Sequence, residues 1–153
     1  MTEPSAVDLA ETLNGSLDGW NRAMGVRFVR ATADEVVAEL EVGDAHRQPY
    51  GVIHGGVHAG LIETATSIGA AIHAMRYGQS VVGLENHTSF LKAAREGTLR
   101  VTARPLTRGR RTQVWEATVV DGAGATLATG RVRLLSLEAD APLAGRLVDI
   151  KPG

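Results

Sequence analysis

The pattern of apolar and polar positions changes character at Gly25. The first 19 residues are polar with scattered apolar positions and include Pro4, Gly15 and Gly19, so we expect a loose lead-in with one short helix around 7–13. Residues 26–29 and 36–42 then show the composition and alternation of two β-strands, joined by a polar turn around 33–34. Regular structure is therefore expected to begin near residue 25.

One long segment, 57–77, has the character of a helix, and its apolar side chains occur on nearly every side: Leu61, Ile62, Ala65, Ile68, Ile72 and Met75. This is typical of a buried helix. After Gly78 the period drops to two over 81–91, 98–106, 113–120 and 126–137, with short turns between. This order of elements, two strands, one buried helix and four more strands, predicts an α+β fold in which a curved antiparallel sheet wraps around one central helix. We expect one domain, 20–138, between the lead-in 1–19 and a surface tail, 139–153.

Composition narrows the class of protein. The 153 residues include no cysteine, which excludes a disulfide framework, a cysteine nucleophile, a thiolate zinc site and an iron–sulfur cluster. A net charge of −1 argues against a nucleic-acid partner. No apolar run approaches the roughly 20 residues of a membrane span, and no leader pattern precedes the strands. We therefore expect a soluble cytoplasmic protein with neither a nucleic-acid nor a membrane partner.

The net charge conceals a split between two segments. Residues 1–44 carry nine acidic side chains against three arginines, whereas residues 92–111 carry Lys92 and six arginines against Glu96 alone. A compact basic segment on a neutral protein fits a small polyanionic ligand. The same pattern also fits an arginine-rich strand face that is simply solvated, and both interpretations remain open from the charges alone.

Glu63 is the most unusual residue, because it lies within the helix expected to be buried. An ionised carboxylate there is costly unless it is paired or hydrogen-bonded, so its presence suggests a function. Ser67 follows one turn later on the same face, where its hydroxyl could bond the carboxylate or orient a water. The alternative is a partly exposed stripe on which Glu63 has no role.

The segment 48–56, just before the helix, ends in His54, Gly55 and Gly56. Glycines at a helix start let a ligand approach the backbone, and the free N–H groups there suit a developing oxyanion. We take the Gly55 N–H as the donor, with Gln48 and His54 as further donors that polarise a carbonyl. A plain helix-capping turn would show the same two glycines.

Gly55 and Glu63 are eight residues apart, or about 12 Å along a helix. A base and an oxyanion donor that act on one carbon must each approach it to roughly 3 Å. One chain does not easily meet both conditions. A symmetric dimer in which Gly55 of one copy faces Glu63 of the other would meet them with two composite sites.

Other chemistries have weaker support. His54 and His58 have i,i+4 spacing with Glu63 nearby, but no His-Glu-x-x-His motif occurs and the two histidines straddle the helix start, so we expect no metal. No Gly-x-Ser-x-Gly motif, dinucleotide fingerprint or phosphate loop is present.

These residues resemble the hotdog-fold acyl-CoA thioesterases, and in particular the PaaI-like branch with the 4-hydroxybenzoyl-CoA and 1,4-dihydroxy-2-naphthoyl-CoA thioesterases. The likeness covers about residues 20–137 and rests on Gln48, His54, Gly55, Glu63 and Ser67 at their intervals. Supporting segments are 81–85, 94–97 and 113–115.

The resemblance implies a hotdog fold and an acyl-CoA thioesterase, an enzyme that hydrolyses an aromatic or bulky acyl-CoA. Gly55 would polarise the thioester carbonyl, helped by His54 and Gln48. Glu63 of the neighbouring subunit would be nucleophile or general base, and Ser67 would hold the water. Relatives are dimers, usually paired into tetramers. No cofactor is implied, because coenzyme A is part of the substrate.

By position, the resemblance also implies a set of coenzyme A contacts: Val82, Gly83, Lys92, Arg95, Arg110 and Arg111. Two other functions are kept as alternatives. One is a hotdog hydratase or dehydratase, although the His-Phe-Pro-Gly and Asp-x-Asn-x-x-His patterns of those enzymes are missing. The other is a non-catalytic acyl-CoA sensor, against which the presence of both Glu63 and Ser67 argues.

Overall fold

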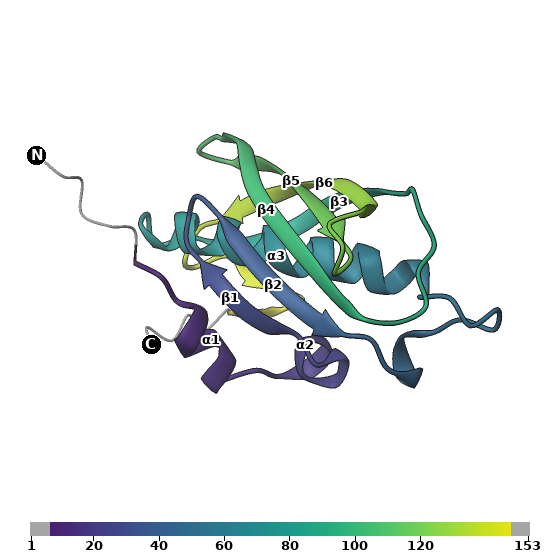
Figure 1. The fold of residues 1–153 in the computed structure, drawn as a ribbon. Coiled ribbons are helices and arrows are strands. Elements are labelled where there is room, and N and C mark those ends of the chain that lie inside the picture. Colours follow the sequence, from purple (N-terminus) through teal and green to yellow (C-terminus); the bar gives the residue numbers. More distant parts are fainter. Residues whose placement is uncertain (1–6, 148–153) are drawn as a thin grey trace, which may run out of the picture.

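The computed structural model describes residues 7–147 (Figure 1). Its helices are α1 (Ala10–Gly15), α2 (Gly19–Met24), a 3₁₀ turn (Asp44–His46) and α3 (Gly55–Met75). Its strands are β1 (Arg27–Ala31), β2 (Val36–Glu41), β3 (Ser80–Phe90), β4 (Thr98–Arg108), β5 (Thr112–Val120), β6 (Thr126–Leu137), β7 (Pro142–Leu143) and β8 (Arg146–Leu147). The predicted long helix and six main strands are present within two or three residues of their expected bounds.

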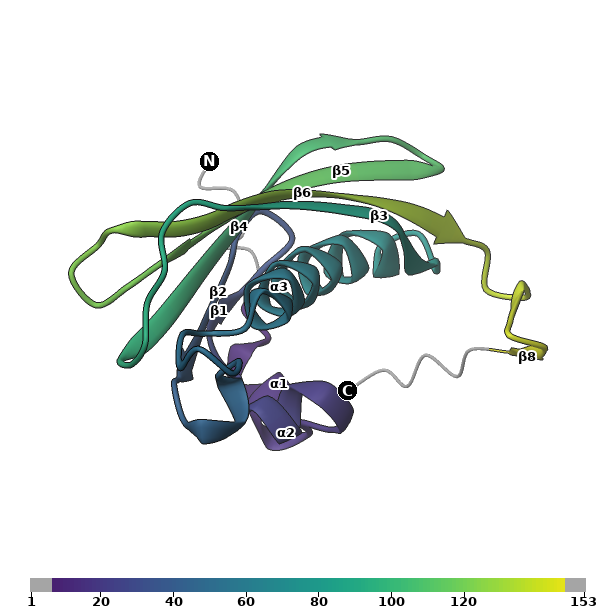
Figure 2. The same ribbon diagram turned by 90° about the vertical axis from the view of Figure 1, so that its right-hand side faces the viewer.

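The six main strands form one antiparallel sheet in the order β1-β2-β4-β5-β6-β3. The sheet arches over α3, which lies in its concave face (Figure 2). The predicted α+β hotdog fold is confirmed. β3 pairs only with β6, so its second edge is open within the described chain.

Alternation along the strands explains how the sheet packs on the helix. On β4, Leu99, Val101 and Ala103 are buried toward α3, while the alternate residues Arg100 and Arg104 are exposed on the outer face. This period of two is the one visible in the sequence.

Trp115 on β5 fixes the position of α3 under the sheet. Its indole is fully buried against Gly69, where a Cβ would overlap the ring, so only glycine permits this approach. Trp115 Nε1 donates to Gln113 Oε1 at 2.9 Å, and Gln113 Nε2 donates to the Ala70 carbonyl at 3.1 Å. The side chains of Trp115 and Gln113 are therefore hydrogen-bonded although they are buried, and the helix is held by both shape and hydrogen bonds.

The acidic and basic segments meet on the outer face of the sheet. Arg100 pairs with Glu39 at 2.8 Å, Arg104 pairs with Glu35, and Arg108 pairs with Asp34 at 2.7 Å. β4 lies beside β2, which brings these oppositely charged side chains together. These three arginines are therefore paired with acidic side chains of the same chain.

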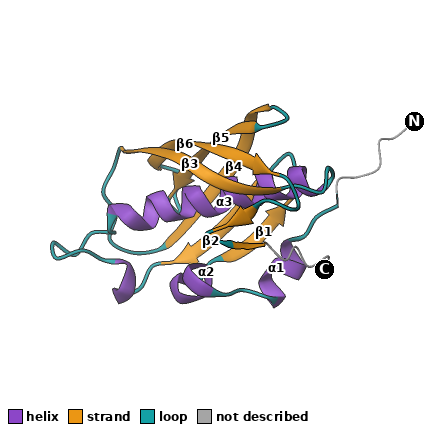
Figure 3. Ribbon diagram, turned by 180° about the vertical axis from the view of Figure 1, so that it is seen from behind, coloured by secondary structure: helices purple, strands orange, loops and turns teal. Residues whose placement is uncertain are grey.

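The lead-in is more ordered than expected. Instead of one helix around 7–13, it contains α1 and α2, and α2 spans the predicted boundary between residues 19 and 20. Asn14 binds both the N–H and the carbonyl of Phe28 at 2.8 Å, which ties α1 to β1. Both short helices lie beside β1 and β2 on the side of α3 that the sheet leaves uncovered (Figures 2 and 3).

The tail forms the short exposed hairpin of β7 and β8, and residues 148–153 lie outside the described range. The division of the chain at residues 19 and 138 remains a prediction. Within residues 7–147, every helix is too short or too polar to cross a membrane.

Candidate active site

The Glu63 carboxylate is half-buried on α3 and is held at both oxygens. Ser67 Oγ donates to Oε1 at 3.2 Å, as the one-turn spacing predicts. Asn86 Nδ2, on β3, donates to Oε2 at 3.0 Å and to the Ala59 carbonyl at 3.1 Å. Thr88 Oγ1 in turn donates to Asn86 Oδ1 at 2.6 Å, which orients the amide. The two hydrogen bonds restrict the carboxylate to one position.

Gly83 gives the carboxylate its space. A Cβ at this position would lie 2.7 Å from Glu63 Oε1, closer than real side chains approach. The register of β3 and β6 shifts between Gly83 and Glu85, which marks an irregularity in the strand at this point. Gly83 therefore contacts the candidate catalytic group directly, and its neighbour Val82 is half-buried on the same strand.

A cavity of about 450 Å³ opens beside Glu63. It is lined by the N-cap residue of α2 and by residues of α2 and α3: Asp18, Trp20, Asn21, Gly60, Glu63, Thr64, Ser67 and Ile68. The sequence identified Glu63 and Ser67, but missed Trp20 and Asn86. Trp20 lay between the expected lead-in, 1–19, and the first expected strand, where the sequence predicted no regular element. Asn86 was one polar position in a strand whose alternation does not single it out.

The start of α3 has the expected form. His54 is the N-cap, and its Nδ1 accepts from the Gly56 N–H at 2.8 Å. The proton of the neutral ring is therefore on Nε2, which stays exposed as a donor. Among residues 7–147 no acceptor is bonded to the Gly55 N–H. Phe90 packs against Gly55 so closely that a Cβ there would lie 2.9 Å from the ring.

The loop before α3 presents Gln48. Its Oε1 accepts from the Tyr50 N–H, which leaves the amide NH₂ group to donate elsewhere. Arg95 braces the loop, because its Nη1 donates to the Tyr50 carbonyl at 2.9 Å. Gln48, His54 and Gly55 thus gather at one end of the helix as donors.

Gly55 and Glu63 belong to one unbroken helix. Their eight-residue separation corresponds to about 12 Å of rise, as the sequence suggested. The single chain therefore separates the candidate oxyanion donor from the candidate base.

Four basic residues of the segment 92–111 were expected to bind coenzyme A, and these four make no ion pair within the described chain: Lys92, Arg95, Arg110 and Arg111. Arg110 and Arg111 occupy the exposed turn between β4 and β5. A cavity of about 470 Å³ there, at the C-terminal end of α3, includes Arg110, Arg108 and His73 in its lining. Burial, and then the positive charges of Arg108 and Arg76, lower the pKa of His73.

His58 is the other histidine of the helix start. It is buried, its Nδ1 has no hydrogen-bond partner within residues 7–147, and burial lowers its pKa. The described residues contain no group of three or more histidine, aspartate or glutamate side chains arranged to hold a metal. His54 is used as a cap, and His58 packs 6.3 Å from Phe90 between ring centroids.

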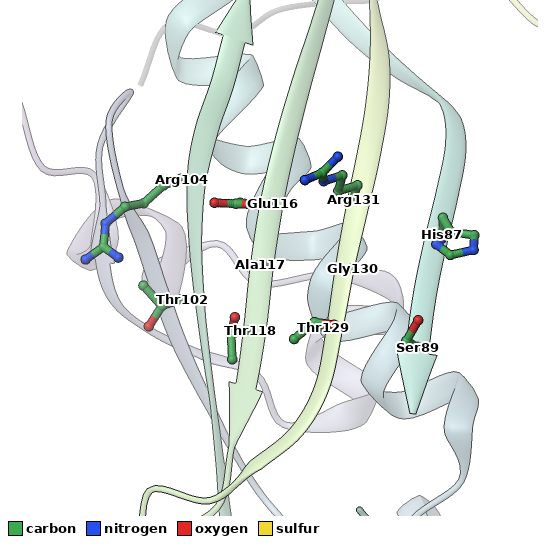
Figure 4. Close-up of a pocket in the computed structure, with 10 residues that line it drawn as sticks. All are labelled: His87, Ser89, Thr102, Arg104, Glu116, Ala117, Thr118, Thr129, Gly130 and Arg131. Carbon is green, nitrogen blue, oxygen red and sulfur yellow. The ribbon is translucent and has the colours of Figure 1, made fainter. Parts of the chain in front are cut away.

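A further hollow of about 490 Å³ lies on the outer face of the sheet (Figure 4). Its rows of side chains follow the strand register: Thr102, Thr118, Thr129 and Ser89 form one row, and Arg104, Glu116, Arg131 and His87 form the next. The sheet separates this hollow from Glu63, and none of the predicted site residues lines it.

Comparison with known proteins agrees with this geometry. The family model described as the thioesterase superfamily matches residues 50–128. The chain is 39% identical over 118 residues to Rv1847 from Mycobacterium tuberculosis, named as an esterase, covering 76% of this chain and 84% of the relative. It is 36% identical over 103 residues to the 1,4-dihydroxy-2-naphthoyl-CoA hydrolase of Listeria monocytogenes, covering 67% and 83%.

Among solved structures, the thioesterase HI1161 from Haemophilus influenzae superposes with a TM-score of 0.81 at 27% identity, covering 86% of this chain and 92% of the other. The matching family model and the shared fold together define the class of this chain, the hotdog-fold thioesterases. The chain belongs to the thioesterase superfamily. It is a thioester hydrolase.

Proposed function

We propose that this enzyme hydrolyses acyl-CoA thioesters to a free acid and coenzyme A, with Glu63 as nucleophile or general base. The observation that carries the proposal is the Glu63 carboxylate, which Ser67 and Asn86 hold at both oxygens beside an open cavity. A fixed carboxylate next to a space for substrate is what either role requires. The reaction needs water and no cofactor.

The electrophile would be activated at the other end of α3. The Gly55 N–H, at the positive end of the helix dipole, would donate to the thioester oxygen as negative charge develops there. His54 Nε2–H and the Gln48 amide would be the additional donors, since each has its other polar atom already engaged within the loop.

The active unit would be a homodimer in which each site combines Gly55 of one copy with Glu63 of the other. The open edge of β3 supports this, because a long exposed edge strand is normally covered. Leu84 and Phe90 on β3 are 52% and 60% exposed in the single chain. A two-fold axis through the middle of β3 would bring Phe90 of one copy, with its neighbour Gly55, to the Gly83 end of the other. Pairing of two such dimers into a tetramer, and a cytoplasmic location, remain part of the proposal.

Coenzyme A would extend from this composite site along the surface. The pantetheine arm would contact Val82 and Gly83. The phosphates would meet Lys92, Arg110 and Arg111, which form no ion pair among the residues that the structure describes. Arg95 would contribute less, because one of its donors is used by the Tyr50 carbonyl. Phosphates and guanidinium groups form charge-assisted hydrogen bonds that suit this arrangement.

The acyl group would be aromatic or otherwise bulky. The similarity to a 1,4-dihydroxy-2-naphthoyl-CoA hydrolase supports an aromatic acyl group. The volume of the cavity beside Glu63, about 450 Å³, is within the range of small-molecule sites.

The direct test is release of free thiol from benzoyl-CoA by the wild type and by Glu63→Ala. We expect Glu63→Ala to remain folded and to lose roughly 10²- to 10⁴-fold in kcat. Glu116→Ala is the matched control, since it removes an exposed carboxylate from the outer face of the sheet, on the side away from Glu63. Near-normal turnover by Glu63→Ala would contradict the mechanism. Binding without any thiol release by the wild type would favour a sensor, and addition of water to an enoyl-CoA would favour a hydratase.

A single turnover in H₂¹⁸O separates the two roles of Glu63. If Glu63 attacks the carbonyl, the thiolate leaves, an anhydride forms, and hydrolysis of that anhydride at either carbonyl distributes ¹⁸O between the product acid and the Glu63 carboxylate. If Glu63 takes a proton from water, all of the label enters the product acid. Mass analysis of the peptide that contains Glu63 shows which pathway is followed.

A further inference from the structure

Trp20 lies against the backbone of α3 one turn before Glu63. A Cβ on Gly60 would overlap Cζ2 and Cη2 of the indole, so the tryptophan occupies the space that any other residue at position 60 would fill. The side chain is 41% exposed and lines the same cavity as Glu63 and Ser67. Gly60 and Trp20 therefore form a matched pair at the edge of the candidate site.

The helix that carries Trp20 is fixed at several points. Asp18 caps its start, accepting from the Gly19 N–H at 2.7 Å, and Thr64 Oγ1 of α3 donates to Asn21 Oδ1 at 2.7 Å. His46 Nδ1 accepts from the Gly43 N–H at 2.8 Å, so the neutral ring carries its proton on Nε2 and donates it to the Met24 carbonyl, also at 2.8 Å. These contacts give the indole a defined position rather than that of a loose surface side chain.

The cavity combines two carboxylates, Asp18 and Glu63, with apolar side chains in its walls. Trp20 and Ile68 supply the large apolar side chains, and Glu63 and Ser67 supply the chemistry at one edge. A reacting carbonyl near Glu63 would place the attached acyl group between these walls. Indole offers a broad flat face on which a planar ring can stack, whereas a flexible alkyl chain gains less from such a surface.

We propose that Trp20 is the acyl-selectivity residue of this enzyme, forming with Gly60 the wall on which an aromatic acyl group stacks. The inference rests on the proposed function, because it takes Glu63 as the reacting group, but it makes a separate claim about specificity. It assigns a substrate-contacting role to the helix before the first strand, outside residues 50–128 that match the family model.

The test compares kcat/KM for benzoyl-CoA and hexanoyl-CoA, whose acyl groups are similar in size and differ in shape. We expect Trp20→Leu to lower the benzoyl-to-hexanoyl ratio about tenfold and Trp20→Phe to keep it within about twofold, because only phenylalanine preserves a stacking face. Leu106→Ala, which removes an exposed apolar side chain of β4, is the control and should leave the ratio unchanged.

Gly60→Ala provides a second route to the same result. Alanine favours the helix, so folding should be retained, while its Cβ displaces the indole without removing it. The benzoyl-to-hexanoyl ratio should fall in the same direction as in Trp20→Leu. This variant decides the question even if Trp20→Leu proves unstable.

Fluorescence gives a readout that does not need turnover. Trp115 is fully buried, so quenching by benzoyl-CoA reports on the exposed Trp20. The quenching can be followed in the Glu63→Gln protein, and it should disappear when Trp20→Phe is added.

If the wild type hydrolyses no acyl-CoA, the proposed function fails. If it is active but the ratio is the same in wild type, Trp20→Leu and Gly60→Ala, the inference about Trp20 is wrong while the proposed function stands.

Discussion

A Cβ on Gly83 would lie 2.7 Å from Oε1 of Glu63, so the position of the carboxylate depends on the absence of a side chain in the neighbouring strand. This close approach connects β3 to the candidate catalytic carboxylate on α3. Replacing Gly83 by alanine, the smallest change that adds a Cβ, therefore tests whether the position of the carboxylate matters for activity.

Gly83→Ala should lower kcat roughly 10- to 100-fold, because the new methyl group must push the carboxylate away from its position by a distance that matters for the reaction. Steady-state thiol release with benzoyl-CoA measures the effect. Gly122→Ala is the matched control, since a Cβ there meets no atom within 4 Å. Equal activity of the two variants would show that Glu63 tolerates displacement.

Asn86 is expected to act as a positioning residue through its bond to Glu63 Oε2. Asn86→Ala should reduce kcat about 10- to 100-fold with little change in KM, because it removes a hydrogen bond to a charged group without touching the substrate. Thr88→Val removes only the hydrogen bond that orients the Asn86 amide, so it should lower kcat by a smaller factor. A rise in KM with constant kcat would instead indicate that Asn86 contacts the substrate.

Arg110 and Arg111 should bind phosphate, because neither has an acidic partner among residues 7–147. Reversing both to glutamate should raise KM for an acyl-CoA roughly 10- to 100-fold, with a much smaller effect on kcat. A higher salt concentration should likewise raise the KM of the wild type, because salt screens the attraction between phosphates and arginines.

The control for this pair is the double reversal of Arg100 and Arg104, which changes the net charge equally. These two arginines pair with Glu39 and Glu35 on the outer face, and exposed pairs of this kind contribute little to stability. If the control raises KM as much as the Arg110 and Arg111 reversal does, the effect is one of overall charge and the assignment to coenzyme A fails.

The buried imidazole of His58 should make stability depend on pH. Burial lowers its pKa in the native state below the ordinary value of 6.5, so as the pH falls below 6.5 the unfolded chain takes up the proton first and unfolding becomes easier. His73, whose pKa is also lowered, contributes with the same sign. The urea midpoint should therefore decrease between pH 7.5 and pH 5.5, and His58→Leu should show a smaller decrease. Identical pH slopes for the two proteins would contradict this explanation.

Much of the fold could be predicted because its determinants are local. A period of two marks the strands, and the apolar segment 57–77 marks the helix, whatever lies next to them. The same holds for Ser67, which contacts Glu63 because four residues on one helix make one turn. His54, Gly55 and Gly56 likewise form the helix start that their order suggests.

The sequence by itself thus determined the α+β architecture, the helix that carries Glu63 and the donors at its start, since each depends on neighbours within a few residues. Only the tertiary structure decided which charges cancel: it paired Arg100 and Arg104 with acidic side chains far away in the sequence, and it gave Arg110 and Arg111 no acidic partner among residues 7–147. It also brought Asn86 and Trp20 to α3, although Asn86 is 23 residues from Glu63 in the chain and Trp20 is 40 residues from Gly60. Such contacts depend on strand order and on how α2 docks, and the period of a segment contains no information about either.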